Sequence, residues 1–310
     1  MKALLFPGQG SQVVGMGAEF YDEFQEVKKI FKIADERLNY PISKIILQGP
    51  SDELQLTQNT QPAILTVSYA IFQILKDRSK FDLNSFEFFA GHSLGEYTAL
   101  VCAEAIKFSD AIYLLHERGK AMQEAVPIGE GDMIAILGMK IQEIEKLINS
   151  SKKNGVCEIA NDNAKGQIIV SGNKIEIENL KLLLKEKKIK FIPLKVSAPF
   201  HCSLMKTAAM QMKEKIDKIN FTNPKVKLVN NVNADVEINS NKIKKLLIDQ
   251  IYSTVRWRES ILYISKKGVK DFIEIGPGKA LSGMVKRTLE NVNSFSVNSI
   301  NDIDNLKNEF

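Results

Sequence analysis

The chain has 310 residues with a formal net charge of +5; 44% of the residues are hydrophobic and 25% are charged. This ordinary globular composition argues against disorder, and no apolar run approaches the roughly 20 residues that a membrane helix needs. The three cysteines are odd in number and widely spaced, which argues against a disulfide framework and a zinc site, and the three histidines show no metal-ligand spacing. We expect a cytoplasmic protein without a metal or a membrane partner, long enough for a large domain and a small inserted one.

Apolar runs alternate with segments of helical periodicity, which predicts an α/β architecture. The first run, residues 3–6, meets Pro7 and Gly8 too early to be a secretory signal, so we predict a buried strand there. The patterns that follow predict helices over 19–38, 62–76, 94–105 and 110–124 and a strand over 86–90.

The middle of the chain follows a different order. Strands are predicted over 133–137, 157–161, 168–171 and 190–194, with helices over 141–148 and 175–186. Strand, helix, strand, strand, helix, strand is the ferredoxin-like pattern, so we expect residues 127–195 to form a small ferredoxin-like subdomain. Residues 1–126 and 196–310 would form a large α/β domain with a parallel sheet, completed by helices over 204–216 and 280–289 and strands over 226–229 and 272–275.

Residues 91–95 spell G-x-S-x-G between a predicted strand and a predicted helix. This context is typical of a nucleophile elbow, in which glycines permit a sharp turn, and it favours an α/β-hydrolase-like large domain over a chance match. Ser93 would lie at a helix N-terminus, where free N–H groups, including that of Leu94, can stabilise an oxyanion. Adjacent side chains on a tight turn point apart, so we interpret His92 as structural.

A serine hydroxyl needs a base to take its proton. His201 lies in a loop just after a predicted strand, and Pro199 restricts the backbone before it. His116 falls inside the predicted helix over 110–124 and is interpreted as a helix-face residue. By elimination, His201 is the best candidate base.

Lysines crowd two stretches of the chain, at residues 181–190 and 242–245. Solvated helix faces are the simpler interpretation of each cluster. The alternative is a docking surface for an acidic partner, such as a phosphorylated cofactor or an acidic protein. No nucleic-acid recognition motif accompanies the charge.

Several motifs together resemble the malonyl-CoA:acyl-carrier-protein transacylase family of bacterial type II fatty acid synthesis. They are residues 8–12 (GQGSQ), 59–63 (NTQPA), 91–97 (GHSLGEY), 118–123 (RGKAMQ) and 198–201 (APFH), with Gln250 and residues 274–278 (EIGPG) further along. The likeness covers nearly the whole chain, in order and without large gaps.

The resemblance implies a role for each matching residue in the chemistry. Ser93 matches the family nucleophile and His201 its general base. Gln250 matches the position whose main-chain carbonyl orients that histidine, which gives a Ser-His dyad without an acidic third member. The backbone N–H groups of Gln9 and Leu94 would form the oxyanion hole.

Two further matches concern the acyl group. Arg118 matches the arginine that binds the malonyl carboxylate, and a guanidinium can do so with two parallel hydrogen bonds. Phe200 resembles the malonyl-selecting version of the family, because a bulky ring would crowd the branch methyl of methylmalonyl.

The implied reaction transfers malonyl from malonyl-CoA to the phosphopantetheine thiol of acyl carrier protein. It would be ping-pong through a malonyl-serine intermediate and need no metal or redox cofactor. The family suggests a monomer supplying fatty acid elongation, and a polyketide pathway stays open. The alternatives are a serine thioesterase or hydrolase with the same elbow, a non-catalytic carrier-protein-binding subunit, and the same fold with another acyl preference.

Overall fold

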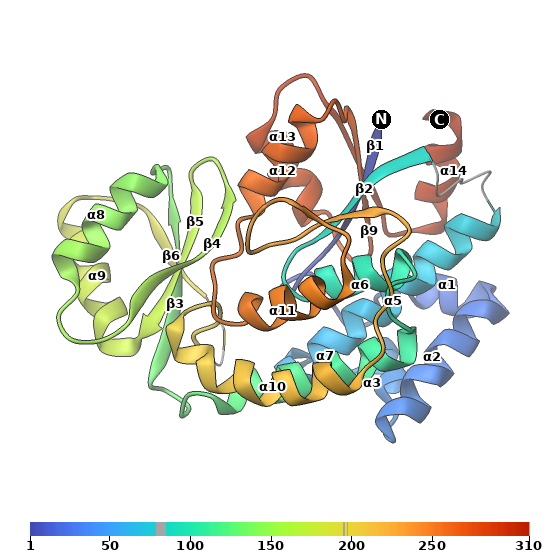
Figure 1. The fold of residues 1–310 in the computed structure, drawn as a ribbon, viewed down its shortest axis with the longest axis horizontal. Helices are drawn as coiled ribbons and strands as arrows, with labels where there is room; N and C mark the ends of the chain where they lie inside the picture. Colours follow the sequence, from blue (N-terminus) through green and yellow to red (C-terminus); the bar gives the residue numbers. More distant parts are fainter. Residues whose placement is uncertain (79–84, 195, 197, 310) are drawn as a thin grey trace.

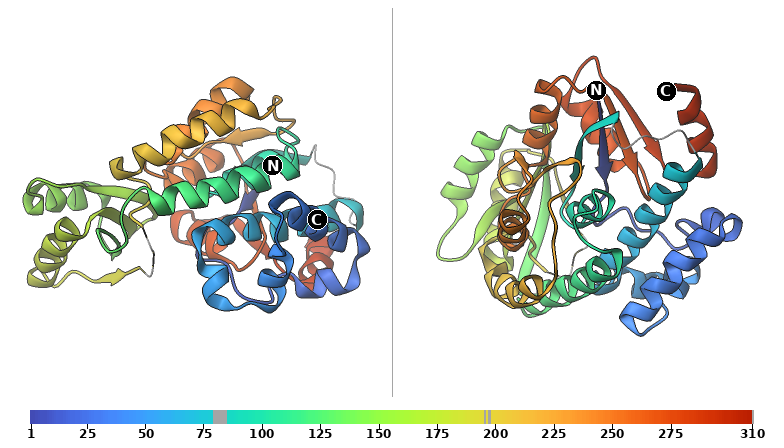
Figure 2. Two further views of the ribbon diagram at one scale, coloured as in Figure 1. Left: turned by 90° about the horizontal axis from the view of Figure 1, so that it is seen from below. Right: turned by 45° about the vertical axis from the view of Figure 1, so that its right-hand side comes forward.

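The computed structural model describes residues 1–78, 85–194, 196 and 198–309. Its strands form two sheets, one of six strands in the order β10-β9-β1-β2-β7-β8 and one of four in the order β4-β5-β3-β6 (Figure 1). The four-stranded sheet and its two helices project from one side of the larger part (Figure 2). Among the described residues, no helix combines the length and the apolar character needed to cross a membrane.

The large sheet is mixed. Its parallel strands are β1 (Lys2–Phe6), β2 (Phe86–Gly91), β7 (Lys227–Val229), β9 (Asp271–Ile275) and β10 (Asn293–Val297). The edge strand β8 (Val236–Glu237) is antiparallel to β7, so the predicted parallel sheet is mixed at this edge. The reason is the tight turn between them, where Asn230 N–H donates to the Asp235 carbonyl and the chain reverses at once.

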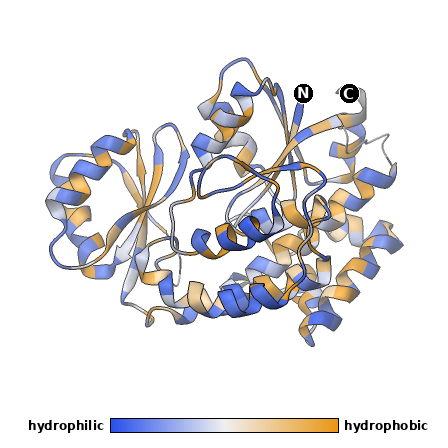
Figure 3. Cartoon of the chain, viewed as in Figure 1, coloured by the Kyte–Doolittle hydropathy of each residue, from blue (hydrophilic) through white to orange (hydrophobic). Residues whose placement is uncertain are grey.

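Alternating residues of the large sheet face two separate cores. Leu4 and Phe6 of β1 belong to one core, and Ala3 and Leu5 to the other, as the period of two along a strand requires. The first core is covered by α2 (Gln25–Leu38), α5 (Thr57–Arg78), α6 (Gly95–Cys102), α7 (Phe108–Glu124), α10 (Lys206–Lys218) and α11 (Ser240–Gln250). The second is covered by α12 (Trp257–Lys266) and α13 (Ala280–Thr288). Most of these helices carry both hydrophobic and hydrophilic residues (Figure 3).

The small antiparallel sheet uses the same alternation. Its strands are β3 (Gly131–Leu137), β4 (Cys157–Ala164), β5 (Gln167–Asn173) and β6 (Phe191–Pro193), and its helices are α8 (Ile141–Ser151) and α9 (Lys174–Glu186). Ile134 and Ile136 pack under α8 and α9, whereas Met133 and Ala135 join the core of the larger part. The inner face of this sheet is therefore held against the rest of the protein. The predicted boundary at residue 195 lies outside the described residues.

Two predicted helices differ from the structure. The helix predicted over 19–38 is broken into α1 (Ala18–Glu23) and α2, because Phe24 is extended (φ −115°, ψ 123°) and buries its ring against Phe20. The helix predicted to begin at Pro62 begins at Thr57 instead. Pro62 lacks the N–H that would bond to the Gln58 carbonyl, and His116 Nδ1 donates to that carbonyl at 3.1 Å.

Other elements were not predicted from the sequence. They are α3 (Ile42–Gln48), α4 (Ser51–Gln55), the short 3₁₀ helix Ser203–Met205, β8, α11, α12, β10 and α14 (Ile300–Glu309). In α12 the buried residues Trp257, Ile261 and Ile264 do follow helical spacing, so periodicity could have identified this helix.

An ion pair with a buried carboxylate links the small sheet to a helix that packs on the large sheet. Arg258 of α12 meets Asp162 of β4 with Nε 3.0 Å from both carboxylate oxygens and Nη2 2.8 Å from Oδ2, and the Asp162 side chain is 1% exposed. The backbone supports the same junction, since Asp162 N–H donates to the Val255 carbonyl at 3.0 Å.

Arg258→Ala is expected to lower the free energy of unfolding by roughly 3 kcal/mol, because the Asp162 carboxylate would stay buried without its counter-charge. Urea denaturation measures the change. Lys213→Ala is the control: it removes an exposed pair with Asp217 and should cost less than about 0.5 kcal/mol. Equal losses in the two variants would refute the structural role of the Asp162 pair.

Candidate active site

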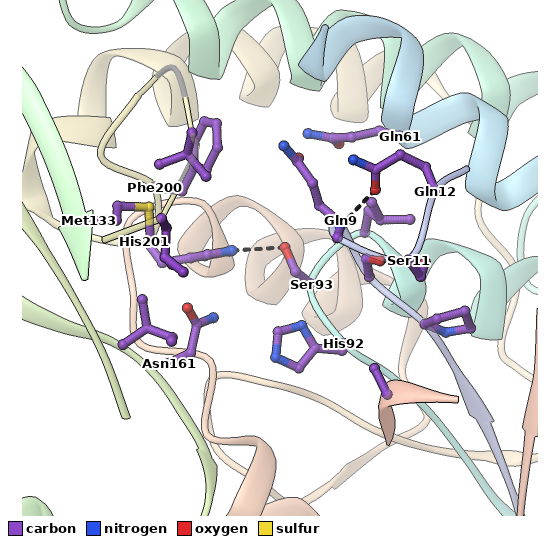
Figure 4. A pocket seen from close by; sticks show the side chains of 18 of the residues that line it. Gln9, Ser11, Gln12, Gln61, His92, Ser93, Met133, Asn161, Phe200 and His201 are labelled. Atoms are coloured by element: carbon purple, nitrogen blue, oxygen red, sulfur yellow. Dashed lines mark hydrogen bonds between the residues drawn. The ribbon is translucent and has the colours of Figure 1, made fainter. Parts of the chain in front are cut away.

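A cleft of about 990 Å³ lies between the end of β2 and the inner face of the small sheet (Figure 4). Both parts of the protein contribute to it. Its lining includes Gln9, Gln61, His92, Ser93, Leu94, Arg118, Asn163, Phe200 and His201. The cleft therefore collects the sequence-predicted residues in one place, apart from Gln250, which is fully buried behind them.

Ser93 lies on a sharp turn between β2, which ends at Gly91, and α6, which begins at Gly95. Its backbone is left-handed, with φ 53°, an unfavourable conformation for a residue with a side chain. The glycines are required by close approach: a Cβ on Gly91 would lie 1.9 Å from the Gly95 carbonyl, and one on Gly95 2.2 Å from the Phe6 carbonyl. The motif thus folds as the predicted strand–turn–helix.

His201 and Ser93 meet although 108 residues separate them, with Ser93 Oγ 2.8 Å from His201 Nε2. Nδ1 of His201 lies 2.9 Å from the main-chain carbonyl of Gln250. A carbonyl can only accept, so Nδ1 carries the proton and Nε2 accepts from the serine hydroxyl. The side where serine hydrolases place a carboxylate is here occupied by a peptide group. His201 is itself left-handed, with φ 58°.

Burial lowers the pKa of His201, the nearby positive charge of Arg118 adds to this effect, and the hydrogen bond to Gln250 opposes both, which together place the pKa at about 3. His201 is therefore neutral over the physiological range. In that state its Nε2 is free to accept a proton.

Arg118 projects from α7 into the cleft with 1% of its surface exposed. Nη2 donates to Ser93 Oγ at 3.1 Å and to Gln250 Oε1 at 2.9 Å, and Nη1 donates to Gln61 Oε1 at 2.8 Å. Within the described part of the chain no carboxylate forms an ion pair with it. Burial lowers the pKa of the guanidinium, while nearby Tyr97 and Glu96 raise it. An arginine keeps its charge in proteins, so the cleft holds a cation whose hydrogen-bond partners are all neutral groups.

The other predicted residues surround this centre. Gln9 follows β1 and Leu94 precedes α6, and among the residues that the structure describes neither backbone N–H donates a hydrogen bond. Phe200 is buried next to His201, and Figure 4 shows both on the opposite side of Ser93 from Gln9. The structure thus brings the predicted residues together around one hydroxyl.

His92 turns away from the serine. Its Nε2 lies 2.8 Å from Asn163 Oδ1 of the small sheet, and its ring packs edge-on against Trp257. The interpretation of His92 as structural agrees with these contacts. Asn163 was not identified from the sequence.

Three further polar residues complete the site and were assigned no role from the sequence. Gln61 and Glu96 lie inside the matching motifs at 59–63 and 91–97. Asn231 follows β7, and the end of a parallel strand is a signal that could have found it. Its Oδ1 accepts from Ser93 N–H at 2.7 Å, and its backbone N–H donates to Glu96 at 3.0 Å. Burial raises the pKa of Glu96 by more than the hydrogen bonds from Asn231 and Gln250 and the charge of Arg118 lower it, which places the pKa at about 7.

Residues 3–305 match the family model described as the acyl transferase domain. The chain is 44% identical to the malonyl CoA-acyl carrier protein transacylase of Bacillus subtilis (strain 168), over 97% of this chain and 95% of that protein. It superposes on the acyl-carrier-protein S-malonyltransferase of Bartonella henselae with a TM-score of 0.96 and 38% identity, covering 99% and 98% of the two chains. It is similar, at 38% identity and a TM-score of 0.95, to a malonyl-transacylase in complex with a type II PKS acyl-carrier protein, covering 100% and 99%.

The lowered pKa of His201 predicts a wide pH range for reaction at Ser93. Since the neutral imidazole persists well below the ordinary value of about 6.5, acylation of Ser93 by p-nitrophenyl acetate should change less than about twofold between about pH 8 and pH 5. Release of p-nitrophenol follows the rate, and circular dichroism at each pH controls for folding. A rate that halves near pH 6.5 would contradict the assignment.

Proposed function

The chain belongs to the acyl transferase family, and on that premise we propose that it transfers malonyl from malonyl-CoA to the phosphopantetheine thiol of acyl carrier protein. The observation that carries the proposal is the buried Arg118 guanidinium, 3.1 Å from Ser93 Oγ and surrounded by neutral partners. A malonyl group attached at Ser93 would bring a free carboxylate to this cation. The malonyl carrier protein so formed would supply fatty acid elongation.

In this proposal Ser93 is the nucleophile and His201 the general base. Ser93 Oγ attacks the thioester carbonyl while its proton passes to His201 Nε2. The intermediate collapses with departure of the CoA thiol, which takes the proton back from Nε2, and leaves a malonyl ester on Ser93. The carrier-protein thiol then reverses these steps, so the kinetics are ping-pong. Throughout these steps the Gln250 carbonyl accepts the hydrogen bond from His201 Nδ1, which keeps Nδ1 protonated and the imidazole ring in place.

The oxyanion formed in each step would be bound by the backbone N–H groups of Gln9 and Leu94. Leu94 lies at the N-terminus of α6, where the helix dipole also favours negative charge. Removing one such donor from a serine enzyme costs about 3–4 kcal/mol of transition-state stabilisation, so this pair would be a large part of catalysis.

Arg118 would select the acyl group. Its fork can bind a carboxylate by two parallel hydrogen bonds, whereas a neutral acyl group would leave the buried cation unpaired. Because the charge of Arg118 is one cause of the low pKa of His201, pairing Arg118 with the malonyl carboxylate would also make His201 a stronger base once substrate is bound. Phe200 would add to the selection by filling the space that a branch methyl needs.

We further propose an α/β-hydrolase-like large domain, formed by residues 1–126 and 196–310, with a ferredoxin-like subdomain at 127–195. Support comes from the serine elbow after β2, and from the order β4-β5-β3-β6, in which each helix-linked pair of strands encloses a third strand. We also propose that the protein acts as a cytoplasmic monomer on its soluble substrate and carrier protein.

Ser93→Ala should abolish covalent malonylation, because the only proposed attachment oxygen is removed. Intact-protein mass spectrometry after incubation with malonyl-CoA detects the adduct. Ser11→Ala is the matched control, since Ser11 lines the same cleft but donates its hydroxyl to the Gly8 carbonyl at 2.8 Å. The wild-type adduct should persist until holo acyl carrier protein is added. Rapid release of free malonate without carrier protein would instead indicate a hydrolase.

Arg118→Ala should lower kcat/KM for malonyl-CoA by about 100-fold or more, the cost of losing a buried charge-assisted contact, and should affect acetyl-CoA far less. Arg118→Lys keeps the charge without the planar guanidinium, so its kcat/KM for malonyl-CoA should lie between those of the wild type and Arg118→Ala. Competition between malonyl-CoA and acetyl-CoA measures the ratio. Arg37→Ala, which removes an exposed arginine paired with Asp110, is the control. An unchanged ratio in Arg118→Ala would remove Arg118 from substrate recognition.

A further inference from the structure

The side-chain amide of Gln250 is fully buried and forms hydrogen bonds through both its oxygen and its nitrogen. Its Oε1 accepts from Arg118 Nη2 at 2.9 Å. Its Nε2 faces three acceptors: Glu96 Oε2 at 2.8 Å, the Ser93 carbonyl at 3.1 Å and Asn231 Oδ1 at 3.2 Å. Only the oxygen end of an amide can accept from a guanidinium, so a flipped Gln250 would turn donors toward Arg118.

Glu96 provides the strongest of these three acceptors, because a carboxyl oxygen forms stronger hydrogen bonds than an amide or peptide oxygen when it is charged. It lies in the first turn of α6, only three residues after Ser93, and is 1% exposed. Its Oε2 also accepts from Asn231 N–H at 3.0 Å. One carboxyl oxygen therefore faces two donors from two different segments, just behind the serine turn.

Gln250 connects this carboxyl group to both parts of the site. Its side chain contacts Arg118, and its main-chain carbonyl accepts from His201 Nδ1. The guanidinium has further contacts: Nη1 donates to Gln61, Nη2 also donates to Ser93 Oγ at 3.1 Å, and its carbon lies 5.9 Å from the centre of the Tyr97 ring, whereas Nε is buried without a partner among the described residues. Nη2 is therefore directed by two acceptors, and the Gln250 amide oxygen, at 2.9 Å, is the nearer of them.

We propose that Glu96 is a positioning residue for malonyl recognition: its carboxyl group fixes the Gln250 amide so that the amide oxygen faces Arg118, which sets the guanidinium toward the acyl carboxylate. This inference rests on the proposed malonyl transfer. Glu96 does not touch the substrate, and it acts through Gln250. Because the required group is an oxygen that accepts two hydrogen bonds, glutamine can replace it, whereas an apolar side chain cannot.

The test compares Glu96→Gln with Glu96→Met by acylation of Ser93 from malonyl-CoA and, separately, from acetyl-CoA. Glu96→Gln should keep both rates within about threefold of the wild type. Glu96→Met should lower the malonyl rate by about 30-fold or more and the ratio of malonyl to acetyl rates by at least about tenfold, because only malonyl needs the oriented guanidinium. A merely structural role would lower both rates together and leave the ratio unchanged, which would overturn the inference.

Three further variants make the outcome decisive. If Glu96→Met does not fold, Glu96→Ala carries the same expectation. In an Arg118→Ala background, Glu96→Met should leave the ratio unchanged, because the residue through which it acts is gone; a further fall would overturn the inference. Glu176→Met is the control, since Glu176 caps the backbone N–H groups of 153–155 outside the cleft and should not alter the ratio. Failure of the wild type to form malonyl-Ser93 would instead reject the proposed function itself.

Discussion

The hydrogen bond from His201 Nδ1 to the Gln250 carbonyl is the interaction on which the geometry of the site depends. It fixes the tautomer of a buried imidazole and leaves Nε2 as an acceptor 2.8 Å from Ser93 Oγ. A carboxylate in this place would add a negative charge close to Arg118 and compete for it. A neutral carbonyl orients the ring without doing so, and the guanidinium stays available for an anionic substrate.

The buried cation explains much of the surrounding polar structure. Arg118 is kept in a water-poor site by the side-chain oxygens of Gln61, Gln250 and Ser93, each of which accepts a hydrogen bond without carrying a charge. Three neutral acceptors lower the cost of burying the guanidinium but do not neutralise it. An acyl group with a terminal carboxylate supplies the missing charge, and this is the physical basis of the proposed selectivity.

Each of the two sheets forms one wall of the cleft. The large sheet and α6 supply the serine turn, and the small sheet closes the opposite wall through contacts such as His92 with Asn163. The ion pair of Asp162 with Arg258 holds β4 against α12 beside this wall. Both Ser93 and His201 have positive φ, so the surrounding packing must stabilise two strained backbone positions at the point where they meet.

The sequence by itself determined most of the strands, though not β8 or β10. It also determined the strand–turn–helix at Ser93, the family and the order of the small sheet's strands along the chain, because these follow from local periodicity, glycine spacing and motif. It did not determine the break at Phe24, the antiparallel edge β8 or the link from Glu96 through Gln250 to Arg118. Glu96 and Gln250 meet at a separation of 154 residues. The break at Phe24 depends on burial of its ring in the core, and β8 is defined by its pairing with β7. Local pattern carries no information about such contacts, and only the folded chain decides them.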